Sequence, residues 1–490
     1  MNRGHRFGFF IVVGACALLI AGCSLFRPLG PDYRRPAPAA SLDASRHAAF
    51  SPETAPERWW ELYRDPLLDD YAGIAMRENL DLRAAASRLE IAQTLLDQTA
   101  AQQWPSTDAS VSLERARGTS SGMRVRNSVS ASLGASYEID LFGRIRRAIE
   151  ASQADVEEQQ FVFAATQIRV VANTITAYLD ICNANAALDA LRRTIEIDVD
   201  TYTTTRRLAD GGTAGQLDVT RARAQLESDR AGVPPLEAQR TAALYALATL
   251  LGRQPDQAPP EAAQCRRPPT LSRPLPLGDR LALLRRRPDV AQAERALASA
   301  TANVGVATAA LYPQVSIGLS IGTAASTLPD ALRAASRTWS LGPMLQWSFP
   351  NQAVARAQLR QAGARADLAM TTYDSTVLAA LKDAESALQS YARELDHHAQ
   401  LLRTRDANQV AFNQANRLYR QGAASFLDLL TAQKSLAVSE QQQVASAGSV
   451  ATGQVAVFLS LGGGWGDAAQ HAAEQARAAA ENRIALEAGK

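Results

Sequence analysis

The sequence predicts a mainly α-helical chain that is built as a tandem duplication and carries four amphipathic β-strands. Three observations predict this fold: two ordered sets of residues that recur about 210 positions apart, very long stretches that lack Gly and Pro, and four stretches in which apolar and polar residues alternate. Hydrophobic residues make up 47 % of the 490 residues, which excludes a disordered chain. The formal net charge of +2 gives no basic excess for nucleic-acid binding.

The N-terminus has the pattern of a bacterial lipoprotein signal. Basic residues precede an apolar run over 9–21, which is shorter than the roughly 20 residues of a membrane-spanning helix. Small residues lie directly before Cys23, as in a lipobox. We therefore expect a signal peptide over 1–22, a lipid such as palmitate on Cys23, and a lipidated tether over 23–60. The alternative is an ordinary signal peptide with a chance cysteine.

The duplication is seen in residue types that recur in order. Arg207, Leu208, Gly212, Ala214, Leu217, Asp218, Ala222 and Leu226 have identical counterparts in Arg417, Leu418, Gly422, Ala424, Leu427, Asp428, Ala432 and Leu436. A second set, upstream, recurs at nearly the same offset. We expect one repeat over about 61–262, a second over about 263–466, and a mobile C-terminal tail over 467–490.

Each repeat contains an unusually long helical stretch. Residues 144–208 contain neither Gly nor Pro, so one helix can run about 95 Å at 1.5 Å per residue. Residues 353–421 are interrupted only by Gly363. We expect long helices over about 144–252 and 353–460. Such lengths indicate coiled-coil-like or solenoid packing, and a soluble coiled-coil rod is the alternative interpretation.

Alternating residues predict two β-hairpins, over about 106–141 and about 314–349. Strands of about ten residues with one apolar and one polar face suit a transmembrane barrel, although the edge of a soluble sandwich also alternates. Four strands cannot close a barrel, since the smallest have about eight. If these strands enter a membrane, several chains must share one barrel, and three chains would supply 12 strands.

Several short motifs carry a resemblance to a known family. They are Leu29-Gly30-Pro31-Asp32-Tyr33, Trp59-Trp60, Tyr137-Glu138-Ile139-Asp140-Leu141-Phe142-Gly143-Arg144 and Arg286-Arg287-Pro288-Asp289. In this order, and together with the duplication, the chain resembles the TolC/OprM-like outer-membrane efflux proteins across nearly all of 23–466. The resemblance implies a homotrimer, with a 12-stranded outer-membrane β-barrel and a periplasmic α-helical barrel.

The resemblance also implies a function and partners. It implies a lipid-anchored exit duct in the outer membrane for drugs or other small molecules, which works with a periplasmic adaptor (a membrane fusion protein) and an inner-membrane resistance-nodulation-division pump. The duct would be passive, with no enzyme activity, metal or cofactor beyond the lipid on Cys23. Alternatives are the exit duct of a metal-ion or type I protein exporter and, less favoured, a structural coiled-coil lipoprotein. The sequence has no nucleophile motif and no metal-ligand spacing, so an enzyme is least favoured.

The duplicated glycines mark turns between long helices. Gly211, Gly212 and Gly422 interrupt the helical stretches, where Gly supplies the backbone freedom for a turn. Part of their role is simply to end one helix and to let the chain turn into the next. By resemblance, these turns are the periplasmic tips that close the tunnel and dock on the adaptor.

Residues beyond the tips are candidates for a periplasmic gate. Asp218 and Asp428 each lie near a helix N-terminus, where capping is the simpler interpretation. In a trimer, Asp428 would form a ring of three charges beside Leu427, and the neutral Thr431 would leave this constriction less negative. Resemblance further implies a hydrogen bond from Tyr419 to Asp218, within a chain or between protomers. The family's Arg at 424 is Ala here, which leaves Arg420 as a substitute cation.

Cys182 and Cys265 remain after signal removal, in an oxidising compartment if the signal is genuine. Helix lengths put both at a similar depth, roughly 45–60 Å from the first tip. This permits a disulfide without establishing contact. The sequence therefore leaves a Cys182–Cys265 disulfide and two buried thiols as alternatives.

Overall fold

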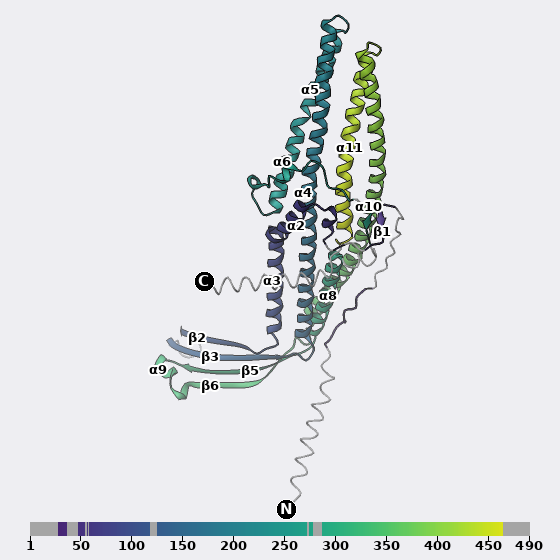
Figure 1. Ribbon diagram of the computed structural model, residues 1–490. Coiled ribbons are helices and arrows are strands. Elements are labelled where there is room, and N and C mark those ends of the chain that lie inside the picture. The colour runs from purple at the N-terminus through teal and green to yellow at the C-terminus, as the bar shows by residue number, and fades with distance from the viewer. Residues whose placement is uncertain are drawn as a thin grey trace, which may run out of the picture. The chain divides into compact units, whose positions relative to one another are not determined.

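The computed structural model describes residues 28–36, 48–53, 56, 58–117, 125–271, 274–277 and 287–463 (Figure 1). The predicted signal peptide, Cys23 and the tail lie outside this part of the chain. The elements, in order, are β1 (Phe50–Ser51), η2 (Trp59–Tyr63), α2 (Pro66–Glu78), α3 (Leu80–Ala101), β2 (Ser106–Arg117), β3 (Val125–Ile139), α4 (Arg144–Asp210), α5 (Gln216–Ala231), α6 (Val233–Leu250), η3 (Pro255–Gln257), η4 (Ala262–Gln264), β4 (Leu275–Pro276), α8 (Pro288–Ala309), β5 (Gln314–Ala325), α9 (Leu328–Ala331), η5 (Ala334–Ser336), β6 (Arg337–Gln346), α10 (Ala353–Arg420) and α11 (Phe426–Ser460). Among the described helices, none has a stretch apolar enough to cross a membrane.

The order of elements repeats along the chain. A helix, a β-hairpin and a pair of long antiparallel helices appear as α3, β2, β3, α4 and α5, and again as α8, β5, β6, α10 and α11. α4 spans 67 residues and α10 spans 68, because no Gly or Pro breaks the first and Gly363 is tolerated within the second. The near-equal lengths follow the duplication of the sequence.

The four predicted strands form one antiparallel sheet, in the order β2-β3-β5-β6. The central β3–β5 pair joins the two repeats. Successive partners across the sheet are Ala109, Leu133, Ile321 and Trp339 on one face, and Ser110, Ser132, Gly322 and Thr338 on the other. One face is thus apolar and the other is made of small polar residues, as the alternation predicts. β2 and β6 are edge strands, and β6 ends at Gln346 instead of continuing to Phe349.

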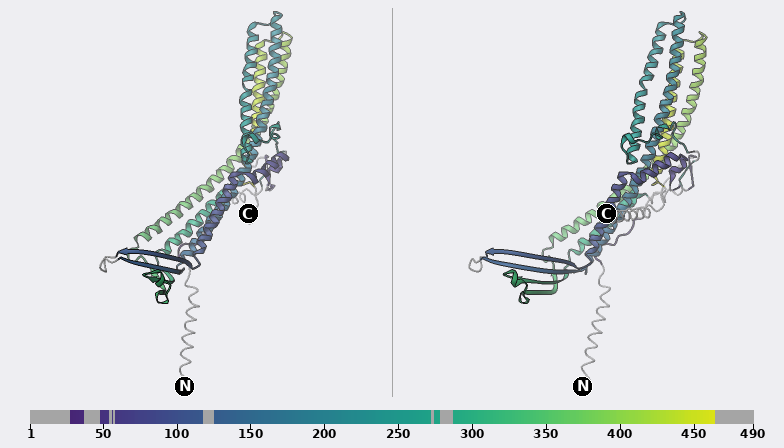
Figure 2. Two further views of the ribbon diagram at one scale, coloured as in Figure 1. Left: turned by 90° about the vertical axis from the view of Figure 1, so that its left-hand side faces the viewer. Right: turned by 60° about the vertical axis from the view of Figure 1, so that its left-hand side comes forward.

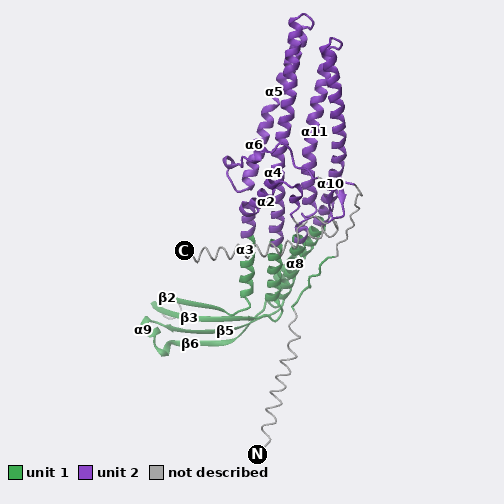
Figure 3. Ribbon diagram, in the orientation of Figure 1, with its two compact units in different colours: residues 1–37, 88–159, 292–375 green, residues 38–87, 160–291, 376–490 purple. Residues whose placement is uncertain are grey.

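The chain divides into two compact units (Figure 3). Unit 1 comprises 1–37, 88–159 and 292–375 and contains the sheet, whereas unit 2 comprises 38–87, 160–291 and 376–490 and contains both long helical hairpins. α4 and α10 each contribute to both units. The main core of unit 2 includes Trp59 and Trp60, and the Trp59 ring stacks on Phe458 of α11 at 4.6 Å between centroids.

The two helical hairpins of unit 2 lie side by side (Figure 2). A second, smaller core packs between them near their tips and consists of Ala222, Phe412, Tyr419, Phe426, Leu429, Leu430 and Leu436. The hairpins differ in one respect, since the predicted helix over 144–252 is broken on its returning side. α5 ends at Ala231, and α6 begins after Gly232 with prolines in its first turn, whereas α11 runs unbroken. Pro234 and Pro235 lack the N–H groups that a continuous helix requires.

Candidate functional site

The tips of the two hairpins have the same backbone geometry. Thr213 N–H donates to Leu208 C=O at 2.8 Å and Gly212 N–H to Ala209 C=O at 3.0 Å. At the second tip, Ala423 N–H donates to Leu418 C=O at 2.9 Å and Gly422 N–H to Tyr419 C=O at 3.0 Å. This is the Schellman pattern of a helix C-terminus, and it recurs at the offset of the sequence repeat.

Glycine is required at one position of each tip for its backbone conformation. Gly212 and Gly422 both have φ of 73°, in the left-handed region that side chains disfavour. A Cβ atom at either position would meet nothing within 4 Å, so the restriction is the dihedral angle and not space. Gly211, the third predicted tip glycine, has no such φ and donates to Arg207 C=O at 3.0 Å.

The two predicted gate carboxylates have different local roles. Asp428 forms a capping box with Ser425: its N–H donates to Ser425 Oγ at 3.2 Å, and its Oδ2 accepts from Ser425 N–H at 3.1 Å. Ser425 Oγ also donates to Asp428 Oδ2 at 2.6 Å, and this hydrogen bond together with the one from Ser425 N–H lowers the pKa of Asp428 below its ordinary value, so the carboxylate stays charged. At the first tip Gly215 replaces the serine, and Asp218 instead makes an ion pair with Arg221 at 3.6 Å.

The other predicted gate residues on α11 lie on the same face, one turn apart. Leu427 is 58 % exposed, and its counterpart in the first repeat, Leu217, is 60 % exposed. Thr431 Oγ1 donates to Leu427 C=O at 2.7 Å, so its hydroxyl bonds within its own helix. The structure therefore brings an uncovered leucine, a charged carboxylate and a neutral hydroxyl together in the first turns of α11.

The predicted hydrogen bond between Tyr419 and Asp218 is wrong within the chain. Tyr419 Oη donates to Thr205 Oγ1 of α4 at 3.2 Å instead. Tyr419 is buried in the smaller core, where its ring packs edge-on against Phe426, and this contact directs the hydroxyl toward α4. Asp218 lies in the first turn of α5 and is held by Arg221.

Arg420, expected as a substitute cation for this contact, also bonds to α4. Its guanidinium forms an ion pair with Asp200. Together with Tyr419–Thr205, this pair fastens the end of α10 to α4, so each contact joins one hairpin to the other. Sequence reasoning missed Thr205 and Asp200, because residues inside a long polar helix carry no signal of a partner on another helix.

A disulfide joins Cys182 of α4 to Cys265, which follows η4. Asn185, one turn along α4, donates through Nδ2 to Cys265 C=O at 2.7 Å and to Ala263 C=O at 3.0 Å. The segment after α6 is thus held against α4 by a covalent bond and two hydrogen bonds. Both cysteines belong to unit 2.

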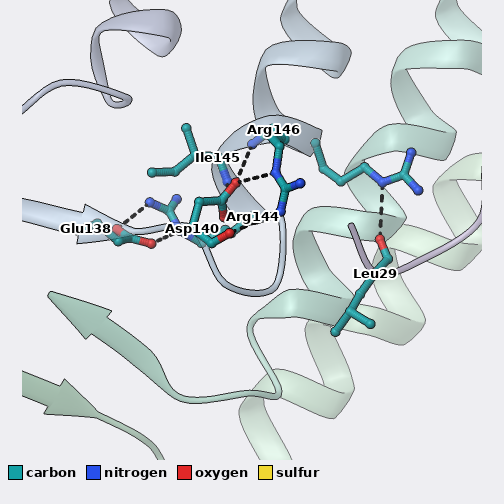
Figure 4. Close-up of polar contacts among 7 residues, drawn as sticks. Leu29, Glu138, Asp140, Arg144, Ile145 and Arg146 are labelled. Atoms are coloured by element: carbon teal, nitrogen blue, oxygen red, sulfur yellow. Dashed lines mark hydrogen bonds and ion pairs between the residues drawn. The ribbon is translucent and has the colours of Figure 1, made fainter. Parts of the chain in front are cut away.

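The end of the first β-hairpin is locked to the start of α4 by charged groups (Figure 4). Asp140 accepts from Ile145 N–H at 3.1 Å and from Arg146 N–H at 3.0 Å, which caps the helix. Glu138 accepts from Arg144 at 3.0 and 2.8 Å in a bidentate pair. The motif over 137–144 therefore fixes the direction in which a strand becomes a helix.

Residues 28–36, the first described stretch of the predicted tether, are held against the helices of unit 1. Arg147 has a side chain only 5 % exposed and donates to Leu29 C=O at 3.2 Å and to Asp32 at 2.6 Å. Tyr33 Oη donates to Glu294 at 2.6 Å. The sequence marked Leu29–Tyr33 only as a family motif, and its binding partners on α4 and α8 were not predicted.

A family model described as "Outer membrane efflux protein" matches residues 73–253 and 281–463. Among curated proteins, the chain is 29 % identical over 470 residues to the solvent efflux pump outer membrane protein SrpC of Pseudomonas putida, covering 91 % of this chain and 97 % of that protein. It is 28 % identical over 455 residues to the cation efflux system protein CusC of Escherichia coli O6:H1, covering 92 % and 97 %.

Solved structures of outer-membrane channels are also similar to this chain. The chain matches the outer-membrane channel OprN with a TM-score of 0.84 and 34 % identity, covering 90 % of this chain and 100 % of that one. It matches CusC with a TM-score of 0.77 and 26 % identity, covering 89 % and 99 %. The two regions that match the family model each contain one β-hairpin and one long helical hairpin.

Proposed function

We propose, from the premise that this chain belongs to the outer membrane efflux protein family, that it is the exit duct of a tripartite efflux system. In this proposal it is a homotrimer that passively conducts small molecules out of the cell. A periplasmic adaptor and an inner-membrane pump of the resistance-nodulation-division type supply the substrate and the energy.

The observation that carries the proposal is the open, two-faced sheet. Its apolar face is exposed at Val111, Leu113, Trp339 and Leu341, each more than 60 % exposed. β2 and β6 leave a row of unpaired backbone groups at each edge, and in lipid each unpaired group costs several kcal/mol. Pairing β6 of one copy with β2 of the next satisfies both edges and turns the apolar faces to lipid. Three copies then give a closed barrel of 12 strands.

The small polar face of the sheet suits the inside of a conducting barrel. Ser110 and Ser132 are hydrogen-bonded at 2.8 Å, as are Ser112 and Ser130. Serine and glycine side chains occupy little volume, which leaves room for solutes and water. This favours a duct over a structural coiled-coil lipoprotein, which would need no such surface.

In the assembled trimer, we propose that the tips at Gly212 and Gly422 form the adaptor-docking end of the tunnel. Three copies of Leu427 and Asp428 then surround a narrow axis as the periplasmic gate. The exposure of Leu427 supports this, because a second and a third leucine would cover it. The low pKa of Asp428 keeps its ring negative and favours cations over anions.

We also propose that Cys23 carries the lipid that anchors the chain to the outer membrane. Only four residues separate Cys23 from Pro28, the first residue of the clamped segment, so the lipid would lie within about 18 Å of it. An intact-mass measurement of the mature protein would reveal the acyl chains, and a Cys23→Ser variant should lack them.

A second candidate is the exit duct of a cation exporter. It is favoured by the similarity to CusC, named as part of a cation efflux system, whereas SrpC is named for solvent efflux. The two candidate functions can be distinguished by expressing the chain with a solvent-efflux or a cation-efflux pump and adaptor, in a host that lacks its own exit ducts. Restored solvent tolerance alone would support small-molecule efflux, and restored metal tolerance alone would support the second candidate.

The duct itself is tested by mass and conductance measurements on the detergent-purified protein. Light scattering should give three chains per particle, and planar bilayers should show small cation-selective steps. Asp218→Ala should raise conductance if the Asp218–Arg221 pair helps to hold the first tip. A particle with the mass of one chain that does not insert into bilayers, and that shows no conductance in the Asp218→Ala variant either, would overturn the proposal.

A further inference from the structure

A buried carboxyl group lies where three long helices meet, below the tips of both hairpins. Asp198 of α4 is 1 % exposed, and its neighbours are Asp229 of α5 and Gln433 of α11. No described basic side chain forms an ion pair with Asp198. A buried charge without a counter-ion is strongly disfavoured, so this position needs a chemical explanation.

The hydrogen bonds around Asp198 and Asp229 all donate toward the two carboxyl groups. Thr201 Oγ1 donates to Gln433 Oε1 at 3.0 Å, which leaves the Gln433 Nε2 group to donate to Asp198 Oδ1. On the other side, Gln225 Nε2 donates to Asp229 Oδ2 at 2.8 Å. Asp198 Oδ2 is buried and meets no donor among the described groups. Two ionised carboxylates that face each other can only accept hydrogen bonds. One proton shared between Asp198 and Asp229 supplies the missing donor.

We propose that Asp198 and Asp229 form a proton-binding site that holds α4 and α5, the two arms of the first hairpin, together below their tip. The shared proton lets the two helices approach without placing two negative charges side by side, one of them buried. Loss of the proton leaves two neighbouring carboxylates and favours separation of α4 from α5. This goes beyond the proposed function, because it concerns a single chain and does not depend on what the duct conducts.

Burial and the Asp229 carboxylate raise the pKa of Asp198 to about 8. The unfolded chain would release this proton near the ordinary value of 3.8, so the folded state binds the extra proton between these two values. The contact is therefore strongest at acidic pH and weakens as the pH rises toward 8. Above that value the protonated fraction falls about tenfold per pH unit.

Charged groups on the surrounding helices are directed elsewhere. Asp200 pairs with Arg420 of α10, Arg230 with Glu227 on α5, and Arg192 with Glu237 of α6. Lys434, next to Gln433 on α11, is exposed. Among the described groups, Asp229 is the one titratable side chain that acts on the pKa of Asp198.

The second repeat shows that the hairpin fold does not require this acid pair. At the offset of 210, Asp198 corresponds to Asn408 and Asp229 to Ser439, both neutral. Asn408 donates to Ser435 C=O at 3.3 Å, and the buried Ser439 donates to Leu436 C=O at 2.8 Å. Equivalent helix positions are thus occupied without a titrating group, which makes the acid pair a specific feature of the first hairpin.

Two measurements on the purified full chain test the site. Infrared spectroscopy from about pH 6 to about pH 10 should show a carboxylic-acid C=O band that is lost with a midpoint near 8. Spin labels at Arg206→Cys of α4 and Arg223→Cys of α5, in protein diluted with unlabelled chain, should move apart over the same range. Glu196→Gln, an exposed acid two residues from Asp198, is the matched control and should titrate like the unaltered protein.

Asp198→Asn keeps the acceptor for Gln433 and donates permanently to Asp229, so it should remove the band and hold the labels close at every pH. Asp229→Asn should also remove the band near pH 8. The absence of a band in the unaltered protein would overturn the proton site. A band without any change in label distance would overturn its control of the contact between α4 and α5, as would an Asp198→Asn variant in which the labels still separate.

Discussion

Tyr419 of α10 donates its phenolic hydrogen to Thr205 of α4, and both side chains are buried between the helical hairpins. Thr205 is fully buried, so its hydroxyl has no access to water if the tyrosine is removed. Beside it, Arg420 pairs with Asp200. The two hairpins of one chain are therefore fastened to each other just below the tips, before any second copy is added.

Tyr419→Phe should lower the free energy of unfolding by about 1–3 kcal/mol, because it leaves the Thr205 hydroxyl buried with one partner fewer. In bilayers the variant should also open more often. Thermal unfolding and single-channel recording measure the two effects. Tyr245→Phe is the control, since Tyr245 is 48 % exposed whereas Tyr419 is buried. Equal stability of the two variants would show that the Tyr419 hydroxyl contributes nothing.

Gly212→Ala and Gly422→Ala should each destabilise a tip by about 1–2 kcal/mol, the cost of a left-handed backbone for a residue with a Cβ atom. Hydrogen exchange of the tip amides should rise in both variants. Gly363→Ala lies in the interior of α10 with nothing within 4 Å of the added methyl group, and should stabilise the helix by about 1 kcal/mol. Destabilisation by alanine at the tips, together with stabilisation by alanine within α10, would identify the dihedral angle as the cause.

Replacing both Cys182 and Cys265 by alanine should lower stability by roughly 4 kcal/mol. The bond closes a loop of 83 residues, and its loss restores chain entropy to the unfolded state. Comparing thermal unfolding of the oxidised, reduced and double-alanine proteins tests this. Intact mass with and without reductant should differ by two hydrogens. A reduced protein as stable as the oxidised one would contradict the expected contribution.

Arg147→Ala should release the clamped segment 28–36. The change removes the donors to Leu29 and Asp32, and a loss of about 1–3 kcal/mol raises the detached fraction about fivefold to 150-fold. Trypsin should then cut after Arg34 correspondingly faster, as followed by mass spectrometry. Arg365→Ala, at an exposed position of α10 in the same unit, should leave the cutting rate unchanged. Equal rates in both variants would show that Arg147 does not hold the tether.

Much of this architecture is predictable from sequence, because its signals are local and periodic. The absence of Gly and Pro over 144–208 predicts α4, and alternation predicts the two hairpins within a few residues. The duplication predicts that the two tips share one geometry. The break at Gly232 is less apparent, because Pro234 and Pro235 are compatible with the first turn of a new helix.

By itself, the sequence determined where the chain is helical, where it is extended, and that the order occurs twice, since these depend on spacing along the chain. Only the tertiary structure decided which side chains meet across helices. It directed Tyr419 to Thr205 instead of Asp218, and Arg420 to Asp200, because packing against Phe426 sets the orientation of the tyrosine. It also brought Asp198, Asp229 and Gln433 together from three helices. Helical periodicity places a residue on a face, but only packing between helices selects its partner.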